Sequence, residues 1–483
     1  MTPTDSSTAF RRGPLAVLLT GIFLIVLDFF VVNVALPSVQ QDLHADTAAL
    51  QWLVAGYALS FGGLLLVASR LADRWGRRRM FVLGTGLFVL SSALCGFAPD
   101  IDTLLAARLV QGAAAAMVGP TVLSLIGDVY DGPHRVRALG AYATVMGVAA
   151  ASGQLVGGLL IHLDLAGSGW RSIFLVNVPV GLAALLAAPR LLPDTRVPAP
   201  LPDAAESLLV VGALTALVLP LVQGQDQGWP LWTELTLVGA AGLAVLAALR
   251  GAALRRRGTA PLVDLEPMRH RAVGAGQLGQ FLLFTGMAAY FLVLALYLQD
   301  GRGLGPLASG VVFSAVAVPY MLGTKYAVGV LTRFGPRAGI SGAALVFGAG
   351  HALLLVAVAE VGVGGSVLWL VPGLALGGVG MGVTLSGLVG VVMASVPPQH
   401  AGTVSATSST LQQVANALGV ALVGIVFFGR LGRGMVGAFE AGLLYLVATT
   451  VAVALAAALL PGRPRAAAQS AQPLAATSSS AAA

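Results

Sequence analysis

Charged side chains are scarce in this chain. Of its 483 residues, 57% are hydrophobic and only 10% are charged, whereas an ordinary soluble domain carries roughly 25% charged residues. So few charges do not cover a surface that faces water, and much of the surface must therefore face lipid. The composition excludes a soluble enzyme and predicts an integral membrane protein.

Cysteine and lysine occur once each, and the histidines are not clustered. The single cysteine, Cys95, excludes an intrachain disulfide and a thiolate metal cage. The six histidines include no pair at metal-ligand spacing. The one lysine, Lys325, lies between Thr324 and Tyr326, so the chain has no Gly-Lys-Ser/Thr phosphate-binding loop. We therefore expect no cofactor and an energy source other than ATP.

Long apolar stretches recur about fourteen times, and a transmembrane helix needs about 20 mostly apolar residues. The stretches lie at 14–36, 51–72, 80–98, 103–126, 138–162, 173–192, 206–224, 231–250, 272–298, 307–330, 338–359, 366–394, 402–428 and 437–460. Pro220 and Pro230 interrupt the seventh and eighth of them. The sequence predicts an all-α membrane protein with about 14 transmembrane helices.

Basic residues in the loops orient these spans. With the N-terminus in the cytoplasm, 21 of the 27 Lys and Arg residues fall on the inner side and 4 on the outer side. An excess of Lys and Arg in cytoplasmic loops is the positive-inside rule. We therefore expect a multi-pass cell-membrane protein with both termini cytoplasmic, and the bias toward Arg over Lys, with much Ala and Gly, suggests a bacterial source. Membrane topology also explains the net charge of +7 without a nucleic-acid partner.

A short motif indicates an internal repeat. The pattern Arg-aromatic-Gly-x-Arg at residues 74–78 recurs at residues 333–337, which lies 259 residues and about eight spans later. This offset fits two six-helix halves with two helices inserted between them, and carriers are commonly built from such repeats. The expected units are a cytoplasmic N-terminus (1–13), an N-terminal bundle (14–200), two inserted helices (201–255), a C-terminal bundle (256–462) and a disordered cytoplasmic tail (463–483).

Two opposite charges lie inside predicted spans at similar depth. Asp28 lies about 12 Å from the outer end of the first span, and Arg108 lies about 8 Å from the same face in the fourth. Ionisable groups are costly inside a bilayer, so each one is a candidate functional residue. One interpretation is a structural ion pair that locks two helices together. We favour the other, in which Asp28 carries a proton and Arg108 is its coupling partner.

Neutral polar and aromatic residues suggest where a solute binds. Asn33, Gln111 and Gln154 add polar groups to the first, fourth and fifth spans, which indicates that these helices face a wet cavity. The alternative for each residue is a hydrogen bond between helices. Tyr57 and Tyr297 could stack against an apolar ligand, although aromatic residues near span ends also anchor helices at the membrane interface.

The loop after the second span combines an acid with several arginines. A basic cluster there is a common topology signal, but that signal requires neither Asp73 nor Gly76. We interpret Asp73, Arg74, Gly76 and Arg77 as a gating loop in which Asp73 pairs with Arg and holds one conformation closed. Arg333 is the counterpart in the second half.

These motifs together resemble the major facilitator superfamily, and within it the fourteen-helix drug:proton antiporter branch. The matching stretches span nearly the whole chain and comprise residues 27–28, 32–37, 52, 57, 71–78, 108, 111–112, 170–181 and 297–299. The resemblance implies two six-helix bundles with a two-helix insertion, export driven by protons, and proton coupling through Arg108. On the match at 297–299 we add Gln299 to the candidate cavity residues.

Three positions depart from the branch pattern. Ser69 stands where the loop motif usually begins with Gly, and Thr332 replaces the acid of the second loop. Gln154 replaces the proline of the fifth-helix antiporter motif. The direction of transport therefore rests on the branch resemblance and not on that motif.

The leading hypothesis is a proton-driven exporter of an amphipathic organic compound, such as an antibiotic or another toxic metabolite, that works as a monomer. A second hypothesis is uptake of a small organic solute, which would raise its concentration inside the cell. A third is a membrane-embedded enzyme or a sensor that transports nothing. That hypothesis predicts a catalytic constellation or a sizeable soluble domain, and the sequence contains neither.

Overall fold

The computed structural model describes residues 10–196, 201–224, 227–259, 261–263, 266–396 and 401–461, which are helical and contain no β-strand. The expected disordered tail, 463–483, lies outside the described residues, as do residues 1–9 of the expected N-terminal segment. The helices are α1 (Arg12–Leu43), α2 (Thr47–Trp75), α3 (Arg77–Gly96), α4 (Ile101–Val129), α5 (Gly132–Leu163), α6 (Ser172–Leu175), α7 (Asn177–Leu191), α8 (Ala204–Gln223), α9 (Leu231–Arg256), α10 (Arg271–Leu296), α11 (Pro306–Phe334), α12 (Pro336–Val361), α13 (Val371–Ala394), α14 (Ala401–Phe428) and α15 (Met435–Ala458).

Fourteen spans account for these helices. Thirteen helical runs are long and apolar enough to cross a membrane, with α6 and α7 joined in one run, Gly169–Leu191. The fourteenth is α5, which bends by 47° between Ala150 and Ser152. The predicted count of about fourteen is therefore confirmed. The two spans interrupted by prolines also form, as α8 and α9.

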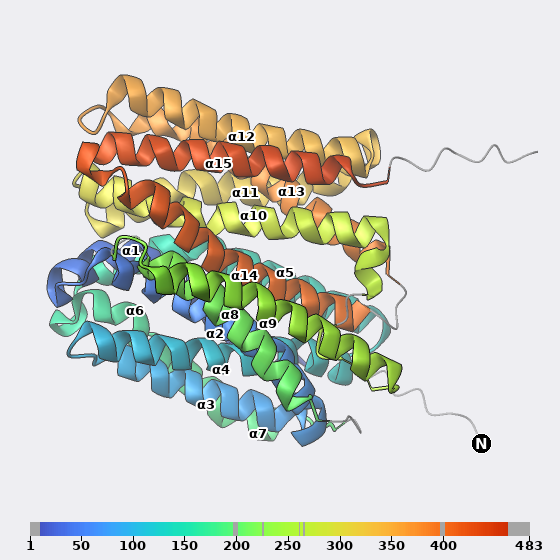
Figure 1. Cartoon of the computed structure of the whole chain (residues 1–483). Coiled ribbons are helices and arrows are strands. Elements are labelled where there is room, and N and C mark those ends of the chain that lie inside the picture. The colour runs from blue at the N-terminus through green and yellow to red at the C-terminus, as the bar shows by residue number, and fades with distance from the viewer. Residues whose placement is uncertain are drawn as a thin grey trace, which may run out of the picture.

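The helices pack as two bundles with the same internal pattern (Figure 1). In the first bundle α1 packs on α5, α2 and α3 pack on α4, and α7 packs on α3. In the second bundle α10 packs on α14, α11 and α12 pack on α13, and α15 packs on α12. Each of these helix contacts in the first bundle has a counterpart in the second bundle, as expected for a carrier built from repeats.

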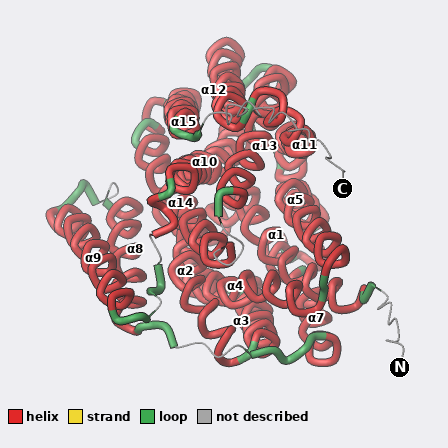
Figure 2. The backbone as a smooth tube through the Cα atoms, turned by 90° about the vertical axis from the view of Figure 1, so that its right-hand side faces the viewer, coloured by secondary structure: helices red, strands yellow, loops and turns green. Residues whose placement is uncertain are grey.

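The inserted helices lie beside the seam between the bundles. The helices α8 and α9 pack on each other, and α8 also contacts α2 of the first bundle and α14 of the second (Figure 2). Asp203 caps the start of α8 and forms an ion pair with Arg250 of α9, with 2.8 Å between Oδ2 and Nη2. Asp203 therefore also joins the two helices of the insertion.

The 259-residue repeat is a repeat of structure. Adding 259 to the residue numbers of α2, Thr47–Trp75, gives the bounds of α11, Pro306–Phe334. The turn after each helix is a glycine with positive φ, 109° at Gly76 and 81° at Gly335. Only glycine adopts such angles at little cost, which explains why both copies of the motif keep it.

The bundles meet closely at the end where α1 passes into α2, here named the α1/α2 end. A Cβ added to Gly158 of α5 would lie 2.3 Å from the carbonyl oxygen of Pro306 in α11. At the same end Gln299 Nε2 donates a hydrogen bond to the carbonyl oxygen of Val34, at 3.0 Å. Toward the opposite end, an added Cβ at Gly147 of α5 or Gly329 of α11 has no atom within 4 Å. The closest contacts of α5 with α11 thus gather at the α1/α2 end.

Candidate functional site

Asp28 of α1 and Arg108 of α4 form an ion pair inside the first bundle. The Nη1 atom of Arg108 lies 2.5 Å from Oδ2 of Asp28, and the two side chains are 1% and 0% exposed. Close packing of α4 on α2 brings Arg108 to this position, because a Cβ on Gly112 would lie 2.4 Å from the backbone oxygen of Tyr57. The two residues that the sequence places at similar depth are therefore in direct contact.

Neutral polar groups complete the coordination of the Asp28 carboxylate. Gln111 Nε2 and Asn177 Nδ2 donate to Oδ1 of Asp28, at 3.0 and 2.9 Å. Both amides also donate to Ser92 Oγ, at 2.9 Å each, and Ser92 Oγ donates to the backbone oxygen of Phe174. We call Asp28, Ser92, Arg108, Gln111 and Asn177 the polar cluster. It links α1, α3, α4 and α7.

Further groups surround the Arg108 guanidinium. Its Nε donates to the backbone oxygen of Leu53 at 3.2 Å, and its Nη1 donates to Gln111 Oε1 at 2.7 Å. The guanidinium carbon lies 4.4 Å from the centre of the Tyr57 ring and 5.6 Å from that of Phe174, which adds cation–π attraction. A buried ion pair is tolerated only with such additional bonds. Protonation of Asp28 would remove the charge that holds this arrangement together.

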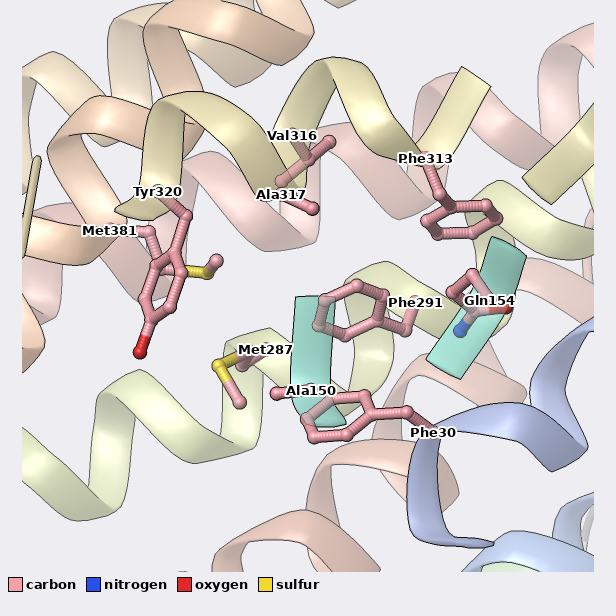
Figure 3. Close-up of a pocket in the computed structure, with 10 residues that line it drawn as sticks. All are labelled: Phe30, Ala150, Gln154, Met287, Phe291, Phe313, Val316, Ala317, Tyr320 and Met381. Atoms are coloured by element: carbon pink, nitrogen blue, oxygen red, sulfur yellow. The ribbon is translucent and has the colours of Figure 1, made fainter. Parts of the chain in front are cut away.

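A cavity lies between the two bundles, and its empty space of about 410 Å³ includes the part that is open to solvent. Its walls come from α1, α5, α10, α11 and α13 and are mostly aromatic, aliphatic and methionine side chains (Figure 3). The lining residues are Phe30, Ala150, Gln154, Met287, Phe291, Phe313, Val316, Ala317, Tyr320 and Met381. An apolar wall with few polar groups is typical of small-molecule sites.

The residues predicted for a cavity are distributed over several places. Gln154 lines the cavity, whereas Gln111 and Tyr57 belong to the polar cluster and its surroundings. The Asn33 side chain donates to backbone oxygens of its own helix. Tyr297 stacks on Phe439, with 4.1 Å between ring centres, and its hydroxyl donates to the backbone oxygen of Gly362. Gln299 connects the bundles at the α1/α2 end and does not line the cavity.

The predicted gating loop forms a compact set of ion pairs at the other end of the first bundle. Arg77 binds Asp73 at 3.0 Å and Asp128, at the end of α4, at 2.6 Å. The backbone N–H of Arg77 donates to the backbone oxygen of Thr195, beyond α7. A Cβ on Gly76 would lie 2.9 Å from Oδ1 of Asp194. The loop therefore ties α2 to α4 and to the segment after α7.

The equivalent turn of the second half is built differently. Pro336 occupies the position that corresponds to Arg77, and Thr332 occupies that of Asp73. Thr332 Oγ1 donates to the backbone oxygen of Gly329 in its own helix. The Arg333 guanidinium carbon lies 5.3 Å from the centre of the Phe334 ring. The backbone of the turn is thus repeated without the Asp–Arg pair.

The sequence prediction did not include Asn177 and Ser92 among the site residues. Asn177 lies in the stretch at 170–181 that carries the family resemblance, and it is a lone amide at the start of an apolar helix. A single amide in an otherwise apolar helix is a sequence signal that indicates a functional residue. Ser92 gave no comparable signal, because serine is common in membrane helices and often donates to its own helix.

Comparison with known proteins gives a consistent result. The sequence profile of the Major Facilitator Superfamily matches residues 18–263 and 277–481. The chain is 38% identical over 429 residues to the probable actinorhodin transporter of Streptomyces coelicolor, covering 88% of this chain and 74% of that protein. It is 38% identical over 439 residues to the puromycin resistance protein pur8 of Streptomyces alboniger, covering 88% and 85%. It is 32% identical over 416 residues to the tetracenomycin C resistance and export protein of Streptomyces glaucescens, covering 85% and 75%.

Solved structures share the fold. The peptide transporter POT in complex with sulfate superposes with a TM-score of 0.66 at 18% identity, covering 95% of this chain and 98% of that one. A POT family transporter in complex with 5-aminolevulinic acid gives a TM-score of 0.68 at 14% identity, covering 94% and 96%. At this level of identity the likeness concerns the fold alone.

Proposed function

The chain belongs to the Major Facilitator Superfamily, and we propose that it exports an amphipathic organic compound, such as an antibiotic or another toxic metabolite, in exchange for protons. It is a membrane transporter of small molecules and not an enzyme. The relatives reported above are a probable transporter, a resistance protein and a resistance and export protein, each concerned with an antibiotic or a similar metabolite. Their names support the direction of transport.

The single observation that carries proton coupling is the Asp28–Arg108 pair within the polar cluster. The Asp28 carboxylate is 0% exposed and accepts from Arg108, Gln111 and Asn177, and these donors favour its charged form whereas burial opposes it. It could accept a proton only when these contacts loosen, so protonation and rearrangement of the bundle are linked. A membrane potential supplies about 2.3 kcal/mol per charge per 100 mV for such a step.

The proposed orientation follows from the loop charges. With 21 basic residues on one side and 4 on the other, the positive-inside rule puts both termini in the cytoplasm. The α1/α2 end then faces outward. In this orientation the contacts of Gly158 and Gln299 at the α1/α2 end would close the outer side, and cargo would enter the cavity from the cytoplasm.

The gating loop would act at the cytoplasmic end of the first bundle. Arg77 contacts Asp73 and Asp128 at once, so one side chain connects the ends of α2 and α4. We propose that this connection keeps the first bundle rigid while it rocks against the second. In the equivalent turn of the second half, Thr332 and Pro336 stand at the positions of Asp73 and Arg77.

The test is transport in everted membrane vesicles that contain the full chain, with an imposed pH gradient and with puromycin and tetracenomycin C as probes. Asp28→Asn should abolish gradient-driven uptake into these vesicles while the protein stays folded in the membrane. Asp102→Asn is the matched control, because that acid lies exposed in the first turn of α4. Unchanged gradient-driven uptake by Asp28→Asn would contradict the proposal, and so would uptake of a probe into whole cells.

A further inference from the structure

The amide of Gln154 is a polar group of the cavity wall that has no hydrogen-bond partner among the described residues. The side chain of Gln154 is 1% exposed, and neither Nε2 nor Oε1 has a hydrogen-bond partner among the described residues. A buried polar group without a partner costs about 1–3 kcal/mol. The other side chains that line the cavity are apolar except for the Tyr320 hydroxyl. The cost is recovered if a ligand bonds this amide.

The backbone of Gln154 is fixed by close packing of α5 on α11. A Cβ added to Gly310 would lie 2.6 Å from the backbone oxygen of Gln154. Helix α5 bends by 47° between Ala150 and Ser152, just before Gln154, and Ala150, on the other side of the bend, also lines the cavity. The backbone of Gln154 is therefore fixed on the wall, and its side chain extends toward the aromatic side chains (Figure 3).

Aromatic rings form the surroundings of this amide. Phe291 and Phe313 are stacked, with 5.8 Å between ring centres and 19° between planes. Phe30 meets Phe291 edge to face at 5.2 Å. Two methionines, Met287 and Met381, add flexible thioethers that adapt to a ligand's outline. Aromatic side chains in the wall favour an aromatic ligand, because aromatic pairs gain about 0.5–1.5 kcal/mol beyond the burial of area.

The charge of the cavity restricts the ligand further. Among the residues that line it, none is acidic or basic. Asp28 is near in sequence to Phe30, but both of its oxygens are occupied by Arg108, Gln111 and Asn177. A ligand with a full charge would leave that charge unpaired in an apolar site, at a cost of several kcal/mol. The cavity thus favours a neutral ligand.

We propose that the cargo is a neutral, planar, fused-ring aromatic compound with a hydrogen-bond donor and a carbonyl acceptor side by side on one edge. That edge pairs with the Gln154 amide, which offers a donor and an acceptor in the same spacing. Gln154 is then a specificity-determining residue. This inference rests on the proposed function, because it takes the cavity to be the cargo site.

The test measures binding of three tricyclic probes to the purified full chain in nanodiscs by equilibrium dialysis, with empty nanodiscs to subtract partition into lipid. Phenanthridin-6(5H)-one carries the N–H and C=O edge, its 5-methyl derivative lacks the donor, and phenanthrene lacks both groups. For Gln154→Leu we expect the affinity for phenanthridinone to fall about tenfold, since two neutral hydrogen bonds are lost. The affinity for phenanthrene should stay within about twofold or rise.

A second variant separates the aromatic wall from the amide. Phe291→Leu should weaken all three probes to a similar degree, because it removes a ring face and leaves the amide in place. The inference fails if Gln154→Leu weakens all three probes equally, or leaves the phenanthridinone affinity unchanged while the purified protein keeps its thermal stability.

These outcomes are independent of proton coupling, because binding is measured without a gradient. If Asp28→Asn loses gradient-driven transport but Gln154→Leu changes no affinity, only the ligand class is wrong. If the probe selectivity is found but Asp28→Asn still transports, the proposed coupling is wrong and the ligand class stands.

Discussion

Removing the charge of Asp28 without changing its shape measures how much the polar cluster depends on the ion pair. In Asp28→Asn the amide oxygen still accepts from Gln111 and Asn177, but the new NH2 group then faces the Arg108 guanidinium, so both the charge and the acceptor of the ion pair are lost. Arg108 keeps its bonds to Leu53 and Gln111 and its contact with the Tyr57 ring, but its charge is buried without a counter-ion. Breaking a buried pair in this way costs about 3–5 kcal/mol. Because Arg108 retains its other contacts, we expect the free energy of unfolding to fall by about 3 kcal/mol, at the lower end of this range.

The double variant, Asp28→Asn with Arg108→Gln, provides the comparison. It leaves two neutral amides that can bond each other, so it should be more stable than the sum of the single losses predicts, with a coupling free energy of about 2 kcal/mol. The free energy of unfolding is measured for the wild type, both single variants and the double variant by titration with a denaturing detergent in mixed micelles. Strictly additive losses would refute the argument that the two charges hold each other inside the bundle.

The same double variant separates a structural pair from a coupling pair. If Asp28 carries the proton, the double variant regains stability but remains inactive in gradient-driven transport. If it transports as the wild type does, the pair only locks α1 to α4. Transport in everted vesicles and unfolding in micelles are measured on the same preparations, so that a folding defect is not mistaken for a loss of coupling.

Two further predictions concern the packing of the bundles and the insertion. Gly158→Ala should separate α5 from α11 at the α1/α2 end, because the new Cβ meets a backbone oxygen. The separation is measured as a longer distance between spin labels placed at that end. The control is Gly147→Ala on the same helix, where the new Cβ has free space and should not change the distance. Hydrogen bonds from the Arg250 guanidinium, and then from the start of α8, hold the pKa of Asp203 below its usual value. The ion pair therefore stabilises the insertion above about pH 4 and is lost as the pH falls through the lowered pKa. Asp203→Asn should lower the melting temperature at pH 7, and its difference from the wild type should shrink in acid; a difference that persists in acid would contradict this assignment.

Much of the architecture could be predicted from the sequence, because hydropathy compares each segment with lipid and needs no knowledge of its neighbours. The fourteen spans, the two inserted helices and the repeat of the Gly76 turn at Gly335 all follow from local composition and spacing. Asp28 and Arg108 stood out for the same reason, since a charge inside an apolar span is costly whatever surrounds it.

Only the tertiary structure decided which side chains meet. The polar cluster needs Ser92 and Asn177, and these reach Asp28 because α3 and α7 pack side by side in the first bundle. The rotation of each helix decided that Gln154 faces the cavity, whereas Tyr297 packs against Phe439 inside the second bundle. Small residues set these rotations, since glycines let one backbone rest on another. A sequence records where such glycines stand, but the helix that each one contacts depends on the whole assembled fold.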